Sequence, residues 1–305
     1  MNARMESAEA DVERLRPRLL ALAYRMLGSA ADAEDAVQDA YLRYQQVSGV
    51  EQADAWLVKA TTRLCIDRLR QAKRRETYIG PWLPEPVAES WAGAEADRLE
   101  MAESLSMAFL VLLETLSPAE RAAYLLREVF GYEFDEIATL IDKTPVNVRQ
   151  IVARARKRVE NNDRRFQTTT EQAEALANRF FEACRSGDVD AIESLLAPDA
   201  VLYSDGGGKA HAAPRPLTNR RQIAKLFSVV FPKAAAHHFD VARTRVNGRP
   251  GVVVSIGGRV VEVFTFDEFQ GRVGTLYVVL NPDKLERWPF PGPDSINDPA
   301  DEPQV

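Results

Sequence analysis

Several features of secreted, membrane and zinc-binding proteins are scarce or missing in this sequence. The 305 residues include two cysteines, Cys65 and Cys184, which lie far apart and form no Cys-x-x-Cys pair. This excludes a disulfide framework and a cysteine zinc site, and we expect both thiols to be buried in apolar cores. No apolar run approaches the ~18–20 residues of a membrane helix, and the first residues lack the apolar stretch of a signal peptide. We therefore expect a cytoplasmic protein without a membrane partner.

Groups suited to catalysis are also scarce. The histidines are His211, His237 and His238. Two adjacent histidines cannot face one site from a strand, and no third ligand lies at helical spacing, which favours surface or interdomain positions. The glycines at 206–208 lack the Gly-x-x-x-x-Gly-Lys-Ser/Thr spacing of a phosphate-binding loop. Since no acid/base pair can be assigned, we expect no enzyme, no metal site and no cofactor.

Charge is distributed unevenly along the chain. The net charge of −6 argues against a protein that coats nucleic acid indiscriminately. Residues 63–76 nevertheless contain six basic and two acidic side chains, and residues 149–165 contain seven and two. Between them, residues 78–103 contain six acidic side chains and one basic one. The pattern predicts two basic helices separated by an acidic linker, although a basic helix alone could equally be a solvated surface.

Two helical domains are predicted in the first half. Apolar residues recur at helical spacing in 15–27, 33–44 and 54–69, which predicts a three-helix domain over residues 8–77. Prolines and a glycine then interrupt the pattern, which predicts a linker over 78–104. Within 105–165, Ser117-Pro-Ala-Glu120 has the form of a capping box. A short helix at 134–141, a three-residue turn and a longer helix at 145–160 have helix-turn-helix spacing.

The second helix of this motif presents polar and cationic side chains outward. Thr144 is its expected N-cap and Pro145 its first residue, so that the first amides can face a DNA phosphate. Asn, Gln and Arg can bond base edges in the major groove, while other cations neutralise phosphates. The residues expected to bind DNA are Thr144, Asn147, Arg149, Gln150, Arg154, Arg156 and Lys157.

The second half has a mixed pattern. Two amphipathic helices, 171–186 and 189–196, precede short strand-like runs separated by turns such as Asn247-Gly248. The strand-like runs are 200–203, 241–246, 251–256, 259–266 and 274–280. This order predicts an α+β domain over 168–285, with a curved sheet over helices. The proline-rich tail, 286–305, is expected to be extended or disordered.

The first half resembles a known family. The runs YRMLGSAADAEDAVQD (24–39) and AWLVKATTRLCIDRLR (55–70) resemble region 2 of extracytoplasmic-function (ECF) RNA polymerase sigma factors. Residues 116–158, which begin LSPAER, are similar to region 4. The resemblance implies partners, namely core RNA polymerase and promoter DNA, and a fold of two all-α sigma domains. One departure is Asp142, where the family's turn usually has glycine; aspartate tolerates left-handed backbone better than most residues.

This resemblance also implies roles for individual residues. The acidic helix of region 2 would contact polymerase through Asp35, Gln38 and Asp39. Region 4 would bind the minus-35 element through the helix that carries Arg149, Gln150 and Arg154. The basic residues that would melt and recognise the minus-10 element are Arg63, Arg68, Arg70, Lys73 and Arg74.

Three further motifs resemble the signatures of the ECF group with a SnoaL-like C-terminal extension, the SigJ type. They are Trp82-Leu-Pro-Glu-Pro86, Asp205-Gly-Gly-Gly-Lys209 and Asn281-Pro-Asp-Lys-Leu285. The resemblance implies a cone-shaped α+β domain that regulates the sigma regions in cis, in place of a separate anti-sigma protein. The residues implied in this regulation are Trp82, Pro84, Asp205, Gly206, Gly207, Gly208, Lys209, Asn281, Pro282, Asp283, Lys284 and Leu285.

We expect the loop at 205–209 to dock near the linker, with residues 281–285 completing the contact. Because the charge of the linker resembles that of a nucleic-acid strand, we also expect it to run through a basic channel of polymerase, anchored by Trp82. Two other functions remain open. The C-terminal half could be an enzyme or bind a small ligand, and the chain could be an ordinary repressor that uses only its helix-turn-helix.

Overall fold

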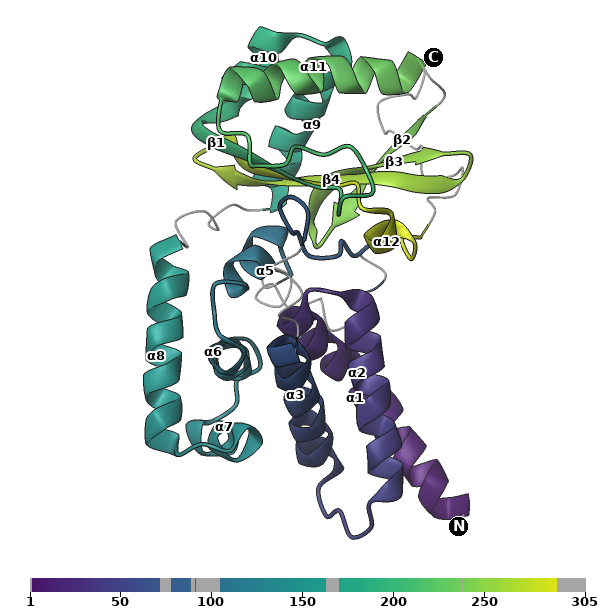
Figure 1. Ribbon diagram of the computed structural model, residues 1–305, viewed down its shortest axis with the longest axis vertical. Coiled ribbons are helices and arrows are strands. Elements are labelled where there is room, and N and C mark those ends of the chain that lie inside the picture. Colours follow the sequence, from purple (N-terminus) through teal and green to yellow (C-terminus); the bar gives the residue numbers. More distant parts are fainter. Residues whose placement is uncertain are drawn as a thin grey trace. The chain divides into compact units, whose positions relative to one another are not determined.

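The computed structural model describes residues 2–71, 78–88, 91, 105–162, 170–236 and 239–289 (Figure 1). The chain forms two compact units. Unit 1 comprises Met1–Thr77 and Ser90–Arg164, and unit 2 comprises Tyr78–Glu89 and Arg165–Val305. The predicted linker is therefore divided: its first part, which we call the strap (residues 78–88), belongs to unit 2.

The described part of unit 1 is helical. Its elements are α1 (Asn2–Leu27), α2 (Ala30–Gln46), α3 (Ala53–Gln71), α5 (Met107–Leu113), α6 (Pro118–Tyr124), the π-helical η4 (Leu125–Val129), α7 (Phe134–Ile141) and α8 (Pro145–Asn162). Gly28 ends α1 with a φ of 68° and donates its amide to the Tyr24 carbonyl at 2.7 Å. The Ser29 hydroxyl then caps α2 by accepting from the Asp32 amide at 3.1 Å. These caps turn the chain so that α1, α2 and α3 pack as the predicted three-helix domain.

Local signals in the second helical domain are confirmed. Ser117 and Glu120 form both hydrogen bonds of the capping box, with Pro118 in the first turn. Asp142 lies in the left-handed region, with φ 54° and ψ 55°, and ends α7 where a glycine would be more usual. The helix that follows Ser117 is not uniform, because a π-helical turn interrupts it after Tyr124.

The two helical domains of unit 1 contact each other through a buried arginine. Arg121 donates to the Met26 carbonyl at 2.6 Å and to the Glu114 carboxylate at 2.8 Å. Burial lowers the pKa of its guanidinium to about 10. Because a buried charge is costly when unpaired, these two bonds hold α6 against the C-terminal end of α1.

Unit 2 is an α+β domain. Its elements are α9 (Thr170–Ser186), α10 (Val189–Leu195), β1 (Leu196–Asp205), α11 (Arg220–Ala236), β2 (Asp240–Val246), β3 (Arg249–Ile256), β4 (Arg259–Phe269), β5 (Arg272–Val279) and α12 (Pro282–Leu285). The strand order is β1-β5-β4-β3-β2, and β1 pairs with β5 in parallel while the other pairs are antiparallel. The predicted α+β class is confirmed. Helix α11 was not predicted, and β1 is longer than the predicted strand.

The core of unit 2 lies between α9, α10, α11 and one face of the sheet (Figure 1). Phe180 and Phe227 from these helices pack against Phe264 of β4, with ring centroids 5.1–6.1 Å apart. Cys184 is buried in the same core, and Cys65 is buried in unit 1, as expected. In the described part of the chain, no helix is long and apolar enough to cross a membrane.

Candidate functional site

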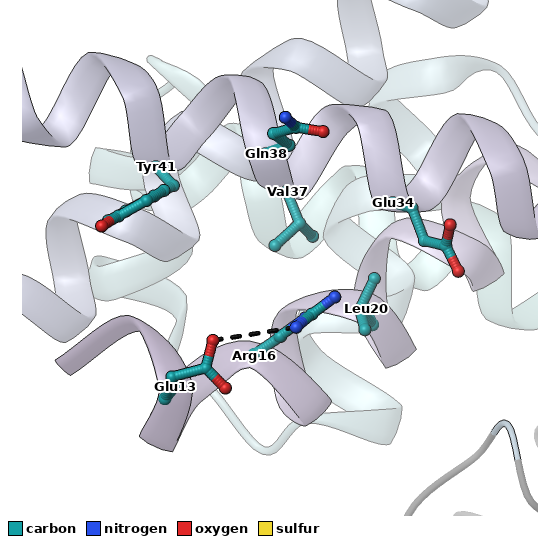
Figure 2. A pocket seen from close by; sticks show the side chains of 7 residues that line it. All are labelled: Glu13, Arg16, Leu20, Glu34, Val37, Gln38 and Tyr41. Carbon is teal, nitrogen blue, oxygen red and sulfur yellow. Dashed lines mark ion pairs between the residues drawn. The ribbon is translucent and has the colours of Figure 1, made fainter. Parts of the chain in front are cut away.

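The residues predicted to bind polymerase lie on α2, beside a groove between α1 and α2. This groove has a volume of about 480 Å³ (Figure 2). Its lining residues are Glu13, Arg16, Leu20, Glu34, Val37, Gln38 and Tyr41. Asp35 and Gln38 are exposed, whereas the Asp39 carboxylate accepts from Arg68 of α3 at 2.7 Å. The structure thus separates two accessible side chains from one that is already paired.

The basic residues of α3 are held by carboxylates in unit 1. Arg63 forms an ion pair with Asp142 in the turn of the helix-turn-helix, and the Lys59 ammonium lies 3.9 Å from the same carboxylate. Arg70 lies 3.5 Å from Asp67. Such partly exposed pairs contribute little free energy, so these cations could exchange their partners for phosphates. The other predicted members of this set, Lys73 and Arg74, lie outside the described residues.

Helix α8 begins and packs as predicted. The Thr144 hydroxyl accepts from the Asn147 amide at 3.3 Å, which confirms the expected cap. The buried line of α8 consists of Val148, Ile151, Val152, Ala155 and Val159. Asn147, Arg149, Gln150, Arg154, Arg156 and Lys157 are all exposed, so the predicted DNA-binding residues share the surface of one helix.

The four α8 cations that were predicted to bind DNA fall into two groups. Arg149 lies 5.3 Å from the ring centroid of Phe134, and Arg156 forms an ion pair with Glu128 at 2.7 Å. The hydrogen bond to Glu128 raises the pKa of Arg156. In contrast, Arg154 and Lys157 form no hydrogen bond or ion pair within the described residues. A negatively charged partner would therefore contact two cations whose side chains are held by residues of α7 or η4. The side chains of the other two, Arg154 and Lys157, can change conformation to fit it.

A second site lies in unit 2, where the strap meets the end of β1. Asp205 is fully buried, with 0% of its surface exposed, and its carboxylate accepts four hydrogen bonds. The donors are the Tyr78 hydroxyl at 2.5 Å, the Leu83 amide at 2.8 Å, the Gly207 amide at 3.0 Å and the Lys284 ammonium at 2.6 Å. Lys284 also donates to the Leu83 carbonyl and lies 4.4 Å from the Trp82 ring centroid. One carboxylate thus joins all three sequence motifs.

The other motif residues complete this contact. The Asn281 amide donates to the Tyr78 hydroxyl at 2.9 Å and its oxygen accepts from the Asp283 amide at 3.1 Å. A Cβ on Gly207 would lie 2.3 Å from the Asn281 side-chain nitrogen, and one on Gly208 would lie 2.8 Å from Ile79. Both glycines also have positive φ, so the close approach and the backbone conformation each require glycine. The remaining motif pair, Lys209 with Asp283, is exposed at 2.6 Å.

Sequence reasoning missed two anchors of the strap. Tyr78 is one; its pKa is raised, chiefly by burial and then by its hydrogen bond to Asp205. Asn247 is the other. Its side-chain oxygen accepts a hydrogen bond from the Val87 backbone amide at 3.0 Å, and its backbone amide donates to the Val87 carbonyl at 2.9 Å. The Asn-Gly pair at this position predicts a hairpin turn, and nothing in it indicates a partner far away in the sequence.

The strap is a buried layer of unit 2. Leu83, Glu85 and Val87 are all buried, and Ala88 forms a bridge with Val246 at the end of β2. The channel that the acidic linker is expected to occupy belongs to polymerase, so that expectation stays a prediction; in the chain alone, the strap is held in unit 2. The acidic residues after Ala88 lie outside the described residues.

One carboxyl on the opposite face of the sheet has an unusual environment. Glu262 of β4 pairs with Val254, a core residue, so its side chain faces the helices. Burial raises its pKa to about 7, and it has no hydrogen-bond or ion-pair partner among the described residues. Within the same residues, no group of three or more His, Cys, Asp or Glu side chains could hold a metal ion.

Comparisons with known proteins cover almost the whole chain. Family models match as Sigma-70 region 2 at residues 12–75, Sigma-70, region 4 at 106–159 and SnoaL-like domain at 177–285. The ECF RNA polymerase sigma factor SigJ of Mycobacterium tuberculosis is 32% identical, over 92% of this chain and 94% of that protein. A probable ECF sigma factor, SigI, of the same species is 29% identical, over 88% and 91%. The crystal structure of SigJ covers 92% of this chain and 99% of its own, with a TM-score of 0.73.

Proposed function

Since the chain belongs to the ECF RNA polymerase sigma factors and carries a SnoaL-like C-terminal domain, we propose how its parts divide the work of promoter-specific initiation. Helix α2 binds core RNA polymerase through Asp35, Gln38 and Asp39. The basic side chains from Arg63 to Arg74 recognise the minus-10 element, and α8 recognises the minus-35 element. Unit 2 regulates these steps in cis, without a separate anti-sigma factor. Because core polymerase is its partner, the protein acts in the cytoplasm.

Reading both promoter elements requires unit 1 to open. The two elements are about 25 base pairs apart, roughly 80 Å of B-form DNA. In the closed unit, Asp142 beside α8 is paired with Arg63 and Lys59 of α3. Helices joined by an ion pair cannot contact DNA sites separated by that distance, so the Arg121 and Asp142 contacts must break when both elements are bound.

The observation that carries the regulatory proposal is the burial of the strap under the Asp205 network. The strap lies in the sequence between the two DNA-binding regions, yet unit 2 holds it at Asp205 and at Asn247. While both ends of the strap are held, residues 78–88 of the linker cannot change conformation. Release would free eleven residues, up to ~36–40 Å of extended chain. Capture of the strap therefore favours the closed arrangement, and its release favours the open one.

We infer a regulatory rather than a catalytic role for unit 2. The three motifs supply hydrogen bonds and ion pairs to the strap and leave no acid/base pair directed at a substrate. The alternative, a small-ligand site or an enzyme in unit 2, is favoured by one observation: the Glu262 carboxyl, on the core side of the sheet, has no hydrogen-bond or ion-pair partner among the described residues. A ligand at Glu262 would act on the face opposite the strap.

Run-off transcription tests this proposal with the full chain and core polymerase at equal holoenzyme occupancy. The main variant is Asp205→Asn, which keeps the shape of the side chain but removes the charge that pairs with Lys284. The matched control is Asp240→Asn, which removes an exposed carboxylate from the same unit. We expect more transcription from Asp205→Asn and no change from the control.

Two truncations extend the test. Removal of the tail beyond Leu280 deletes Asn281 and Lys284, and we expect it to raise transcription in the same way. Removal of everything from Thr168 lowers transcription if unit 2 also supports the open form. Equal rates from all four proteins, including the unaltered chain, would leave unit 2 without a regulatory role and would favour the enzyme or ligand-binding alternative.

A further inference from the structure

The centre of the exposed face of α8 is apolar. Val146, in its first turn, is 61% exposed, although α8 otherwise buries its valines. At 100° per residue, Val146 lies opposite the buried line through Val148, Ala155 and Val159. Exposed Ala153 and the aliphatic stem of Lys157 continue the same line in the next turns. A narrow apolar ridge therefore runs along the middle of the surface that the proposed function assigns to DNA.

Polar groups flank this ridge on both sides. Arg149, held by the Phe134 ring, lies on one side, and Asn147 and Arg154 lie on the other. Gln150 is one turn after Val146, close to the ridge. Cations at the edges of a helix can reach the phosphates that border a DNA groove, whereas the middle of the helix faces the base edges. Val146 occupies the position from which the first turn of a recognition helix contacts bases.

The fold itself gives no reason for valine at this position. Its side chain is mostly in water, so it adds little to the core of unit 1. Alanine is a better helix former than a β-branched residue, and a polar side chain would be better solvated. A single exposed valine is unremarkable on most surfaces, but here it stands at the centre of a face that is otherwise polar.

We propose that Val146 contacts the 5-methyl group of a thymine in the upstream promoter element. Thymine is the only standard base that presents a methyl group in the major groove, and apolar side chains recognise it by contact. Arg149 and Gln150, one turn further along, supply the hydrogen bonds to neighbouring bases. This inference rests on the proposed role of α8 and adds which base it distinguishes.

The test removes the methyl group from the DNA instead of from the protein. A promoter is first selected from a randomised library by holoenzyme that contains the full chain, and each thymine of its upstream element is then replaced by deoxyuridine. For one thymine we expect about a fourfold loss of affinity, the equilibrium equivalent of the ~0.8 kcal/mol of one buried methyl group. With Val146→Ala, thymine and deoxyuridine at that position should bind within 1.5-fold of each other, since roughly that ratio corresponds to a residual contact of ~0.2 kcal/mol.

A control variant is available on the same chain. Val229→Ala removes a valine that is 47% exposed on α11 in unit 2, and it should leave the fourfold preference for thymine unchanged. If holoenzyme selects an upstream element but treats thymine and deoxyuridine alike at every position, the inference is wrong and the role of α8 stands. If the selected element contains no thymine, the inference is also wrong. If no upstream element is selected at all, the proposed function of α8 itself fails.

Discussion

The exposed polar face of α8, for which DNA binding is proposed, and the strap site of unit 2 satisfy their polar groups in opposite ways. On α8, Gln150, Arg154 and Lys157 are exposed, and they form no hydrogen bond or ion pair within the described residues. In the strap site, the buried Asp205 carboxylate accepts four hydrogen bonds, two of them from residues of the strap itself. The first surface is suited to a partner outside the chain, whereas the second already holds its partner.

This difference distinguishes a surface suited to binding another molecule from an internal contact that holds the strap. We call this contact, formed by Asp205 and Lys284 with the strap, the lock. Exposed cations retain their hydration and exchange partners at little cost, which suits a DNA site that must form and dissociate. A buried carboxylate that loses its donors is costly, so the strap site can be either fully formed or fully released. The strap network is thus suited to switching between two states.

The largest effect is expected from Asp205→Ala, which removes the carboxylate at the centre of the strap site. It leaves the Lys284 ammonium without its buried partner and removes the acceptor of the Leu83 amide. We expect a loss of about 3–5 kcal/mol in the free energy of unfolding of unit 2. Hydrogen exchange of the Leu83 amide should become much faster. Lys209→Ala, which breaks the exposed pair with Asp283, is the control and should cost ~0–1 kcal/mol. Equal protection of Leu83 in both variants would contradict the proposed lock.

A second test separates close approach from backbone strain. Gly207→Ala and Gly257→Ala both place a side chain at positive φ, 57° and 54°, and the strain should cost ~1–2 kcal/mol in each. At Gly207 the new Cβ also displaces the Asn281 side chain and its bond to Tyr78, whereas at Gly257 no atom lies within 4 Å. We therefore expect Gly207→Ala to cost about 1–3 kcal/mol more, measured by thermal unfolding. Equal losses would show that the loop moves away from Asn281 freely.

Glu262 differs from both sites, since it is partly buried on the core side of the sheet and, like Arg154 and Lys157, has no hydrogen-bond or ion-pair partner among the described residues. Its folded-state pKa is about 7, against an ordinary value of 4.5. The folded protein thus binds the proton more tightly, so its stability falls as pH rises from about 4.5 to 7 and stays lower above 7. Glu262→Gln has no such charge, and we expect urea unfolding at pH 8 to show a gain of up to ~3 kcal/mol.

The same measurement at pH 4.5 should show little difference between Glu262→Gln and the unaltered chain. Glu182 provides a control, because its pKa is lowered by the hydrogen bond from Arg185. Glu182→Gln should not raise stability at pH 8. A gain at pH 4.5 as large as at pH 8 would show that Glu262 is unfavourable for reasons other than its charge.

The smallest effect is expected at Asp142, whose carboxylate pairs with Arg63, one of the residues proposed to bind DNA, and with the neighbouring Lys59. Asp142→Asn keeps a residue that tolerates the left-handed backbone but removes the charge beside Arg63 and Lys59. Stability should change by less than ~1 kcal/mol. Promoter binding by holoenzyme should increase about twofold at low salt, and the increase should disappear at high salt. An increase that persists at high salt would rule out an electrostatic origin.

The features that sequence predicted correctly depend on local physics. The caps at Ser117 and Thr144, the turn at Asp142 and the outward polar face of α8 all depend on residues that are close together in the sequence. The three motifs of unit 2 were located only through their resemblance to a family, and the structure brings them together at Asp205.

The features that sequence did not predict depend on contacts between distant segments. Val87 and Asn247 are 160 positions apart, and neither residue type signals the other. Arg121 directly follows the capping box, but its buried bond to the Met26 carbonyl exists only after two helical domains have packed. Periodicity also failed for α11, whose outer surface carries Leu226, Val229 and Val230 and therefore lacks a clear polar face.

The position of the strap in the sequence has a consequence for synthesis of the protein. Tyr78 and Leu83 leave the ribosome long before Asp205 and Lys284, the residues that hold them. At about 5–20 residues per second, Lys284 follows Ala88 by roughly 10–40 s. During that interval the synthesis of the second sigma domain is completed, while the strap still has no complete sheet to bind. Each newly made molecule therefore passes through a period without its lock, and only completion of β5 and α12 ends that period.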